Sequence, residues 1–375
     1  MEREAQGRPA SRADTAHMRR ALALARRGWG QTAPNPLVGA AIVNAGRIVG
    51  EGWHARFGGD HAEVAALRAA GAAARGATIY VSLEPCAHHG KTPPCTEALL
   101  HSGVARVVVA VRDPSEIARG GLEHLSAGGI AVESGVLAAT AWELNAPFFH
   151  ALESVRPWVT LKLALSLDGA MADSTGRSRW ITGSRARREV HRLRAGSDAI
   201  AVGIGTALAD DPQLTVRGVT PPRLPPQRVI FDRRTRLPLD GALVRTAREI
   251  PTVVICDAPP PEPARTRALE RAGVVVVPAP SLEVAMAVLR SRGVRSLLVE
   301  GGPHLAGALL AASLVDRLII FRAPVLLGGG AQSPFASLPA SPVTGAERLV
   351  TIRQRTLGDD VMTTYALQAP PCSPD

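Results

Sequence analysis

Cysteine is scarce in this chain: its 375 residues include only Cys86, Cys95, Cys256 and Cys372. Four cysteines are too few for a disulfide framework in a chain of this length. No apolar run is long enough to span a bilayer, and residues 1–12 lack the apolar core of a secretory signal. These absences favour a soluble protein in a reducing compartment, and we expect a cytoplasmic location with no membrane partner.

Lysine is almost absent as well. Lys91 and Lys162 are the only two, so arginine is the main cation of the chain. The formal net charge of +10 is uneven, because residues 1–150 hold 15 basic against 13 acidic side chains and the excess lies beyond them. A concentration of arginines over residues 177–248 is typical of a surface that binds phosphorylated small molecules or nucleic acid, although solvated surface arginines would give the same composition.

The length favours two domains of ordinary size. We place the boundary within residues 145–157, which gives expected domains at 13–150 and 155–368. In both halves strands alternate with helices, a pattern that predicts α/β layers. A homo-oligomer is a common state of soluble proteins, so we expect one.

In the first half, apolar runs at 37–43 and 48–53 flank Asn44-Ala45-Gly46, which predicts a hairpin. Asp14 is expected to cap a helix whose apolar face includes Met18 and Leu22. The other elements expected there are helices at 62–74, 96–101 and 137–149, and strands at 78–83 and 106–111.

In the second half, a buried strand from residue 158 is expected to turn at Asp168-Gly169. The further strands expected are 199–202, 228–231, 252–256, 274–277, 296–299, 317–321 and 361–367, with helices at 185–195, 265–272, 282–290 and 305–311.

The most informative stretch contains His61-Ala62-Glu63, Pro85-Cys86 and, after an eight-residue loop, Cys95. One neutral imidazole and two thiolates fill three corners of a tetrahedral zinc and leave the fourth open for water. Zinc lowers the pKa of that water towards neutrality, so hydroxide becomes available. Glu63 would stand beside the metal and shuttle protons. His-x-Glu followed by Pro-Cys is the signature of zinc nucleobase deaminases, with the two cysteines normally closer together.

The first half resembles the deaminase part of the bifunctional riboflavin-biosynthesis deaminase/reductases. The resemblance rests on residues 84–95, on Pro34-Asn35-Pro36-Leu37-Val38-Gly39 and on Gly50-Glu51-Gly52-Trp53-His54. It implies a cytidine-deaminase-like three-layer α/β/α fold and zinc hydrolysis of a diamino-ribosylamino-pyrimidinone 5′-phosphate. Asn35 and His54 would orient the base, with His88 and Lys91 near the ribose phosphate. The loop after Asp113 is one residue shorter than the family pattern.

The second half resembles the reductase part of the same family, over the strand with Lys162, over residues 178–183 and over residues 194–217. The resemblance implies a dihydrofolate-reductase-like fold that reduces the ribosyl group to ribityl with NADPH. Residues implied to hold the dinucleotide are Ala164, Trp180, Thr206, Asp210, Gly301, Gly302, Pro303, His304, Leu305, Ala306 and Gly307. Residues implied to hold the ribose phosphate are Ser178, Arg194, Leu214, Arg217 and Glu300, with Lys162 as a further polar contact. Arg233 stands where the family has a small hydroxyl residue.

Three alternatives share these motifs. A nucleic-acid deaminase would have the same metal residues, but the near-neutral charge of the first half and the long cysteine loop argue against it. A structural zinc protein would need a fourth ligand, which His88 or His89 could supply. A protein with only one active half is the third.

Overall fold

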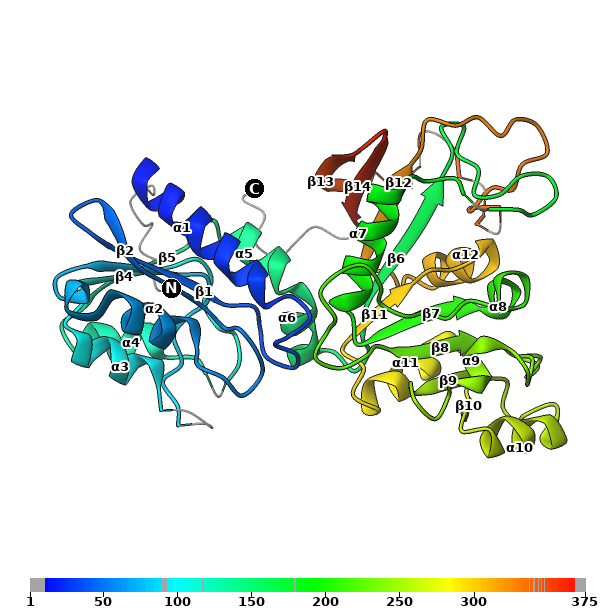
Figure 1. Ribbon diagram of the computed structural model, residues 1–375, viewed down its shortest axis with the longest axis horizontal. Coiled ribbons are helices and arrows are strands. Elements are labelled where there is room, and N and C mark those ends of the chain that lie inside the picture. The colour runs from blue at the N-terminus through cyan, green and yellow to red at the C-terminus, as the bar shows by residue number, and fades with distance from the viewer. Residues whose placement is uncertain are drawn as a thin grey trace. The chain divides into compact units, whose positions relative to one another are not determined.

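The computed structural model describes residues 11–89, 93–116, 118–178, 180–336, 338–339, 341–342, 344, 346 and 348–367. They form two compact units that divide between Leu152 and Glu153 (Figure 1). In the described part of the chain, no helix combines the length and the apolar character that crossing a membrane requires.

The first unit is built on a five-stranded sheet in the order β2-β1-β3-β4-β5. β1 pairs antiparallel with β2 and β3, while β3, β4 and β5 run parallel. The expected hairpin joins β1 to β2 through Ala45 and Gly46, both at positive φ. The strands are β1 (Gly39–Asn44), β2 (Arg47–Trp53), β3 (Thr78–Val81), β4 (Arg106–Val109) and β5 (Ala131–Ser134).

Helices cover both faces of this sheet, as Figure 1 shows. Successive side chains of β3 point to opposite faces of the sheet, and each face is covered by its own helices. Ile79 and Val81 pack with α2, α3 and α4, whereas Tyr80 packs with α1 and α5. The three-layer α/β/α prediction is therefore confirmed. The helices are α1 (Arg12–Ala25), α2 (Ala62–Ala70), α3 (Cys95–Ser102), α4 (Gly121–Ala127), α5 (Ala138–Leu144) and α6 (Ala146–Glu153), with short 3₁₀ turns η1 (Arg26–Gly28) and η2 (Gly71–Ala74).

The second unit is built on a nine-stranded sheet in the order β10-β9-β8-β7-β11-β6-β12-β14-β13. In this order, all neighbouring strands from β10 through to β12 pair in parallel. At the other edge of the sheet, β14 pairs antiparallel with β12, and β13 pairs antiparallel with β14. The strands are β6 (Trp158–Leu165), β7 (Ala199–Gly203), β8 (Gln227–Phe231), β9 (Thr252–Cys256), β10 (Val275–Pro278), β11 (Ser296–Val299), β12 (Arg317–Arg322), β13 (Val350–Leu357) and β14 (Asp360–Ala366).

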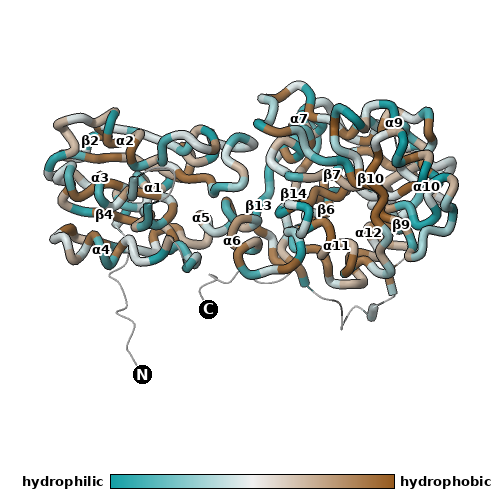
Figure 2. Tube along the Cα trace, turned by 90° about the horizontal axis from the view of Figure 1, so that it is seen from below, coloured by the Kyte–Doolittle hydropathy of each residue, from teal (hydrophilic) through white to brown (hydrophobic). Residues whose placement is uncertain are grey.

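Six helices among the described residues pack on this sheet. Helices α11 and α12 cover one face of the sheet. Helices α8, α9 and α10 cover the opposite face, where α7 packs on β12 and β14. Figure 2 shows hydrophobic stretches along β6, β9 and β10. Since the carboxyl ends of parallel strands share one edge, the loops after β6, β7 and β11 meet there. The helices are α7 (Ser184–Ala195), α8 (Ile204–Asp210), α9 (Ala242–Arg245), α10 (Pro263–Arg271), α11 (Leu282–Ser291) and α12 (Pro303–Ala311).

Two local predictions are wrong. Ser11, not Asp14, caps α1, and its hydroxyl accepts the Asp14 N–H at 3.0 Å. Asp14 is buried and accepts hydrogen bonds from Tyr80 and Arg106 instead. The single helix expected at 137–149 is two helices, α5 and α6, which are separated at Asn145.

Candidate functional sites

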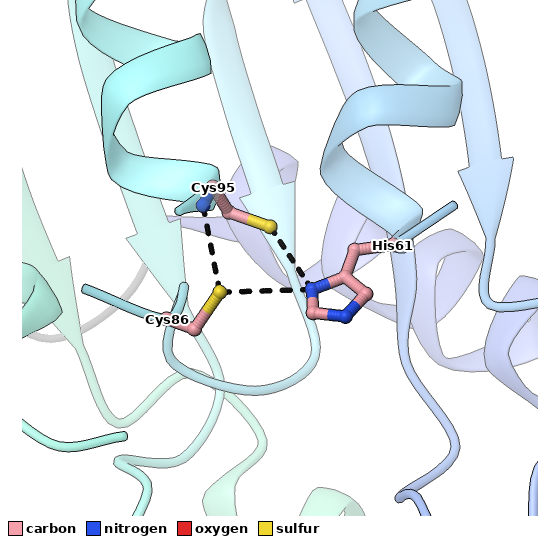
Figure 3. Close-up of side chains that lie close together, drawn as sticks. All are labelled: His61, Cys86 and Cys95. Carbon is pink, nitrogen blue, oxygen red and sulfur yellow. Dashed lines mark hydrogen bonds between the residues drawn. The ribbon is translucent and has the colours of Figure 1, made fainter. Parts of the chain in front are cut away.

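Two helix starts and the segment after a strand bring His61, Cys86 and Cys95 together (Figure 3). His61 is the N-cap of α2, Cys95 is the first residue of α3, and Cys86 follows the segment that leaves β3. The ligand atoms of the three residues lie within 4.8 Å of one another. His61 Nδ1 is 3.2 Å from Cys95 Sγ and 3.6 Å from Cys86 Sγ.

This donor set fits zinc, which binds imidazole nitrogen and thiolate sulfur in tetrahedral sites. Hydrogen bonds from Cys95 and His61 lower the pKa of the Cys86 thiol, against the effect of its burial, and the same hydrogen bond raises the pKa of Cys95. Cys86 is therefore ready to be a thiolate, the form that binds metal. Among the described residues, no other histidine, cysteine or carboxylate belongs to this group of possible ligands.

Glu63 lies in the first turn of α2, two residues from His61, and is 3% exposed. Burial raises the pKa of its carboxyl group to about 7. A carboxyl group with a pKa near neutrality both accepts and donates a proton, as a general acid–base requires.

His54 and Asn35 adjoin the metal ligands. The His54 ring meets the His61 ring edge-on, with centroids 5.6 Å apart. His54 Nδ1 lies 2.9 Å from the Asp60 carbonyl, which only accepts, so Nδ1 carries the proton and Nε2 accepts from Asn35 Nδ2 at 3.2 Å. Burial lowers the pKa of His54, in keeping with this neutral ring.

The other residues predicted near the deaminase substrate are less fully placed. His88 is half-buried, and its Nδ1 has no hydrogen-bond partner among the described residues. His89 is exposed and pairs with Glu97 at 3.1 Å. Lys91 lies outside the described residues. The loop after Asp113 is held by Glu84, whose buried carboxylate accepts the N–H groups of Asp113 and Leu122 at 3.1 Å each.

The second unit brings Lys162, Arg194 and Glu300 together, from β6, α7 and the end of β11. Arg194 forms a two-pronged ion pair with Glu300, at 2.5 Å (Nε–Oε1) and 3.0 Å (Nη2–Oε2). Lys162 Nζ is 3.5 Å from Glu300 Oε2. Burial would raise the pKa of Glu300, but the positive charges of Arg194 and Lys162 lower it to about 2. Ala164 follows two residues after Lys162 on the same face of β6.

The segment after α8 carries Leu214 and Arg217 and contacts α7. Leu214 is buried with φ at +50°. The Thr215 carbonyl accepts from Arg194 Nη1 at 2.9 Å, and the Arg217 N–H donates to His191 Nδ1 at 3.2 Å. His191 was missed by the sequence reasoning. Its position three residues before Arg194, on the same side of a helix, was the available signal.

The loop predicted to hold a dinucleotide joins β11 to α12. Gly302 is the N-cap of α12 and Pro303 its first residue. A Cβ on Gly302 would lie 3.2 Å from Thr206 Oγ1, so the beginning of α12 adjoins α8. Leu305, Ala306 and Gly307 are buried in the core, His304 is exposed, Gly301 is buried, and Asp210 is half-buried at the end of α8.

The remaining predicted residues are exposed. Ser178 and Trp180 precede α7, and the Arg187 guanidinium lies 4.6 Å from the centroid of the Trp180 ring. Trp180 is 72% exposed, which is unusual for an indole. Arg233 forms an ion pair with Asp257 at 2.8 Å.

Comparison with known proteins gives two family matches. Residues 11–111 match the cytidine and deoxycytidylate deaminase zinc-binding region, and residues 157–362 match the RibD C-terminal domain. The riboflavin biosynthesis protein RibD of Aquifex aeolicus is 40% identical over 94% of this chain and 98% of its own length. That of Escherichia coli is 43% identical over 93% of this chain and 98% of its own.

Solved structures agree over the same span. RibD of Acinetobacter baumannii superposes with a TM-score of 0.80 at 38% identity, covering 94% of this chain and 98% of its own. A diaminohydroxyphosphoribosylaminopyrimidine deaminase/5-amino-6-(5-phosphoribosylamino)uracil reductase of Thermotoga maritima superposes with a TM-score of 0.81 at 34% identity and the same coverage. The chain therefore belongs to the RibD family of bifunctional riboflavin biosynthesis proteins, which join a zinc-dependent deaminase to an NADPH-dependent reductase.

Proposed function

We propose that the first unit deaminates 2,5-diamino-6-ribosylamino-4(3H)-pyrimidinone 5′-phosphate and that the second reduces the ribosyl group of the product to ribityl. The observation that carries the proposal is the three-ligand metal site with the buried carboxyl group of Glu63 beside it. Three protein ligands leave an open position, which is the arrangement of catalytic rather than structural zinc.

In the deaminase site, each residue has a task that its position supports. His61, Cys86 and Cys95 would hold zinc, which when bound would supply the Lewis acidity that lowers the pKa of a water. Glu63 takes the proton of the attacking water and returns it to the departing ammonia. Asn35 and His54, joined by their hydrogen bond, orient the pyrimidine base, with His88 and Lys91 towards the ribose phosphate.

In the reductase site, the cofactor carries the hydride and the protein holds both partners in place. Ala164, Trp180, Thr206, Asp210 and residues 301–307, which comprise the end of the loop after β11 and the first turns of α12, hold the dinucleotide. Ser178, Leu214, Arg217 and the Lys162–Arg194–Glu300 group hold the substrate. Glu300 balances the charge of Arg194, whereas Arg217 Nη1 donates to the neutral amide of Gln213 at 3.3 Å. Arg217 is therefore the better phosphate ligand, and Arg194 supports the segment that carries it.

The cysteines bear on the cellular location. Thiolate ligands and the free thiol of Cys256 suit a reducing compartment, and we propose a cytoplasmic location. The substrate is a small phosphorylated pyrimidine, and the predicted homo-oligomer stays a prediction.

The test is Glu63→Gln, assayed for ammonia release and, separately, for NADPH oxidation with the deaminated substrate. We expect ammonia release to fall by about 10²–10⁴-fold, the usual contribution of a general acid–base. NADPH oxidation and bound zinc should be unchanged, because Glu63 belongs to the first unit and is not a ligand.

Glu123→Gln is the matched control, since Glu123 is an exposed carboxylate on α4 of the same unit. Ammonia release that survives in Glu63→Gln would contradict the assigned role. A wild-type protein that holds zinc and releases no ammonia from this substrate would contradict the deaminase proposal itself.

A further inference from the structure

The segment between α8 and β8 holds its shape through contacts with other elements. Residues 211–217 form neither helix nor strand, and Asp211, Leu214 and Gly218 have positive φ. Two side chains of α7, His191 and Arg194, bind its backbone from the side. Arg194 Nη1 donates to the Thr215 carbonyl at 2.9 Å, and His191 Nδ1 accepts the Arg217 N–H at 3.2 Å.

These two hydrogen bonds have opposite polarity. A guanidinium only donates and stays charged at every physiological pH, so the bond from Arg194 persists. A histidine nitrogen accepts only while it has a free lone pair. Protonation of His191 would convert Nδ1 into a donor that faces the Arg217 N–H, and that hydrogen bond would be lost.

The charges around His191 oppose its protonation. Burial, followed by the positive charges of Arg194 on the same helix and Arg217 on the segment, lowers its pKa. Glu300 after β11 and a hydrogen bond with the Thr215 backbone act in the other direction, and the lowering is the larger effect. Lys162 on β6 pairs with Glu300 and partly offsets that carboxylate. The neutral ring is therefore the resting form, and acidification adds a positive charge beside two arginines.

We propose that His191 is a positioning residue of the reductase half, which in its neutral form holds the Arg217 backbone so that the Arg217 side chain meets the substrate phosphate. Binding of the phosphorylated substrate consequently weakens when His191 is protonated. The link to substrate rests on the proposed function, since it takes Arg217 as the phosphate ligand, whereas the link between His191 and the segment rests on the contacts alone.

The contact is tested without substrate, by hydrogen exchange of a peptide covering residues 213–218 between about pH 5 and pH 8, where histidines change charge. After correction for the intrinsic exchange rate, wild-type protection should fall roughly two- to tenfold towards pH 5, the effect of one hydrogen bond. His191→Gln, whose amide oxygen accepts at every pH, should remove that pH dependence. His191→Leu should show low protection throughout.

His124→Gln is the control, because His124 is an exposed histidine in the first unit; it should behave as wild type. The exchange of β11 amides in the same samples reports whether the second unit is folded. If His191→Leu unfolds, the comparison of wild type with His191→Gln is sufficient to test the proposal. An identical pH dependence in wild type and His191→Gln would overturn the proposal.

The functional link is tested by the KM of the deaminated substrate over the same pH range. The substrate phosphate also changes its charge over this pH range, but it does so equally for every variant. Its effect on KM therefore cancels when wild type is compared with His191→Gln. Wild-type KM should rise on acidification roughly two- to tenfold more than that of His191→Gln, with the KM of NADPH unchanged. Equal slopes would reject the link to substrate. Absence of NADPH oxidation in wild type would instead reject the proposed function and leave the exchange result standing.

Discussion

Glu300 is the residue on which the charge balance of the reductase site depends. It is half-buried between Arg194 and Lys162, which lower its pKa to about 2. An unfolded glutamate titrates near 4.3, so the folded pKa is depressed. The corresponding stability, about 3 kcal/mol, is present above about pH 4.3 and is lost as the pH falls through about 2.

Glu300→Gln should therefore lower the free energy of unfolding of the second unit by about 3 kcal/mol at neutral pH, because it leaves Arg194 and Lys162 without their carboxylate. The difference from wild type should shrink as the pH falls below about 4. Urea unfolding at several pH values measures this. Glu270→Gln, an exposed carboxylate on α10, is the control; an equal loss at neutral and acidic pH would contradict the charge argument.

Single residues were predictable where chemistry dictates the residue type. His61, Cys86 and Cys95 were found because a zinc site requires those ligands, and the structure brings them together. Lys162, Arg194 and Glu300 were predicted singly, from resemblance, and only the structure shows that they interact, since no local pattern links residues so far apart in the chain. His191 went unnoticed because its partner is a backbone N–H, and sequence does not show which backbone groups lie exposed beside a helix.

At the scale of elements, the contact of β2 with α2 sets the position of the metal site. A Cβ on Gly52 would lie 2.3 Å from the Ala62 carbonyl oxygen and 2.4 Å from the Ala66 nitrogen, both in α2. Helix α2 therefore rests directly on the backbone of β2. Since His61 is the N-cap of α2, any displacement of this helix moves a metal ligand away from Cys86 and Cys95.

We expect Gly52→Ala to destabilise the first unit by about 1–3 kcal/mol, the usual cost of overpacking, and to weaken zinc binding. A competition titration with a chromophoric chelator measures zinc affinity, and thermal unfolding measures stability. Gly329→Ala is the control, because a Cβ there meets no atom within 4 Å and its φ is not positive. If Gly52→Ala binds zinc as tightly as wild type and is equally stable, the prediction is wrong and α2 can shift to make room for the added methyl group.

Most elements with a buried apolar pattern were predicted, and those without one were missed. β13 is mainly exposed and forms the edge of its sheet, and β5 is also largely exposed, so neither shows clear alternation. The short helices α4, α8 and α9 were missed as well. The break between α5 and α6 lies just before Pro147, which has no N–H to continue a helix and is a local signal that was overlooked. A long-range contact also holds this point: the Asn145 amide accepts from the N–H of Leu37 at 2.8 Å and donates to its carbonyl at 2.9 Å. Such a contact depends on the folded unit rather than on local propensity.

At the scale of the whole molecule, each unit has its own hydrophobic clusters. A ligand stabilises only the cooperative unit that binds it, by roughly 2.7 kcal/mol when its free concentration is a hundred times its Kd. Calorimetry of the zinc-loaded protein should then resolve two transitions. Removing zinc with a chelator should lower only that of the first unit, by roughly 5–10 °C, and adding NADPH should raise only the other.

Cys95→Ser provides the control for this experiment, because it removes a metal ligand and should make the first transition insensitive to the chelator. A shift of both transitions by either ligand would mean that the two units unfold together, and the deaminase and reductase sites would then share one stability. Separate shifts would mean that a destabilising change in one half leaves the other folded. In a bifunctional chain, that independence would let one half lose its activity while the other continues to work.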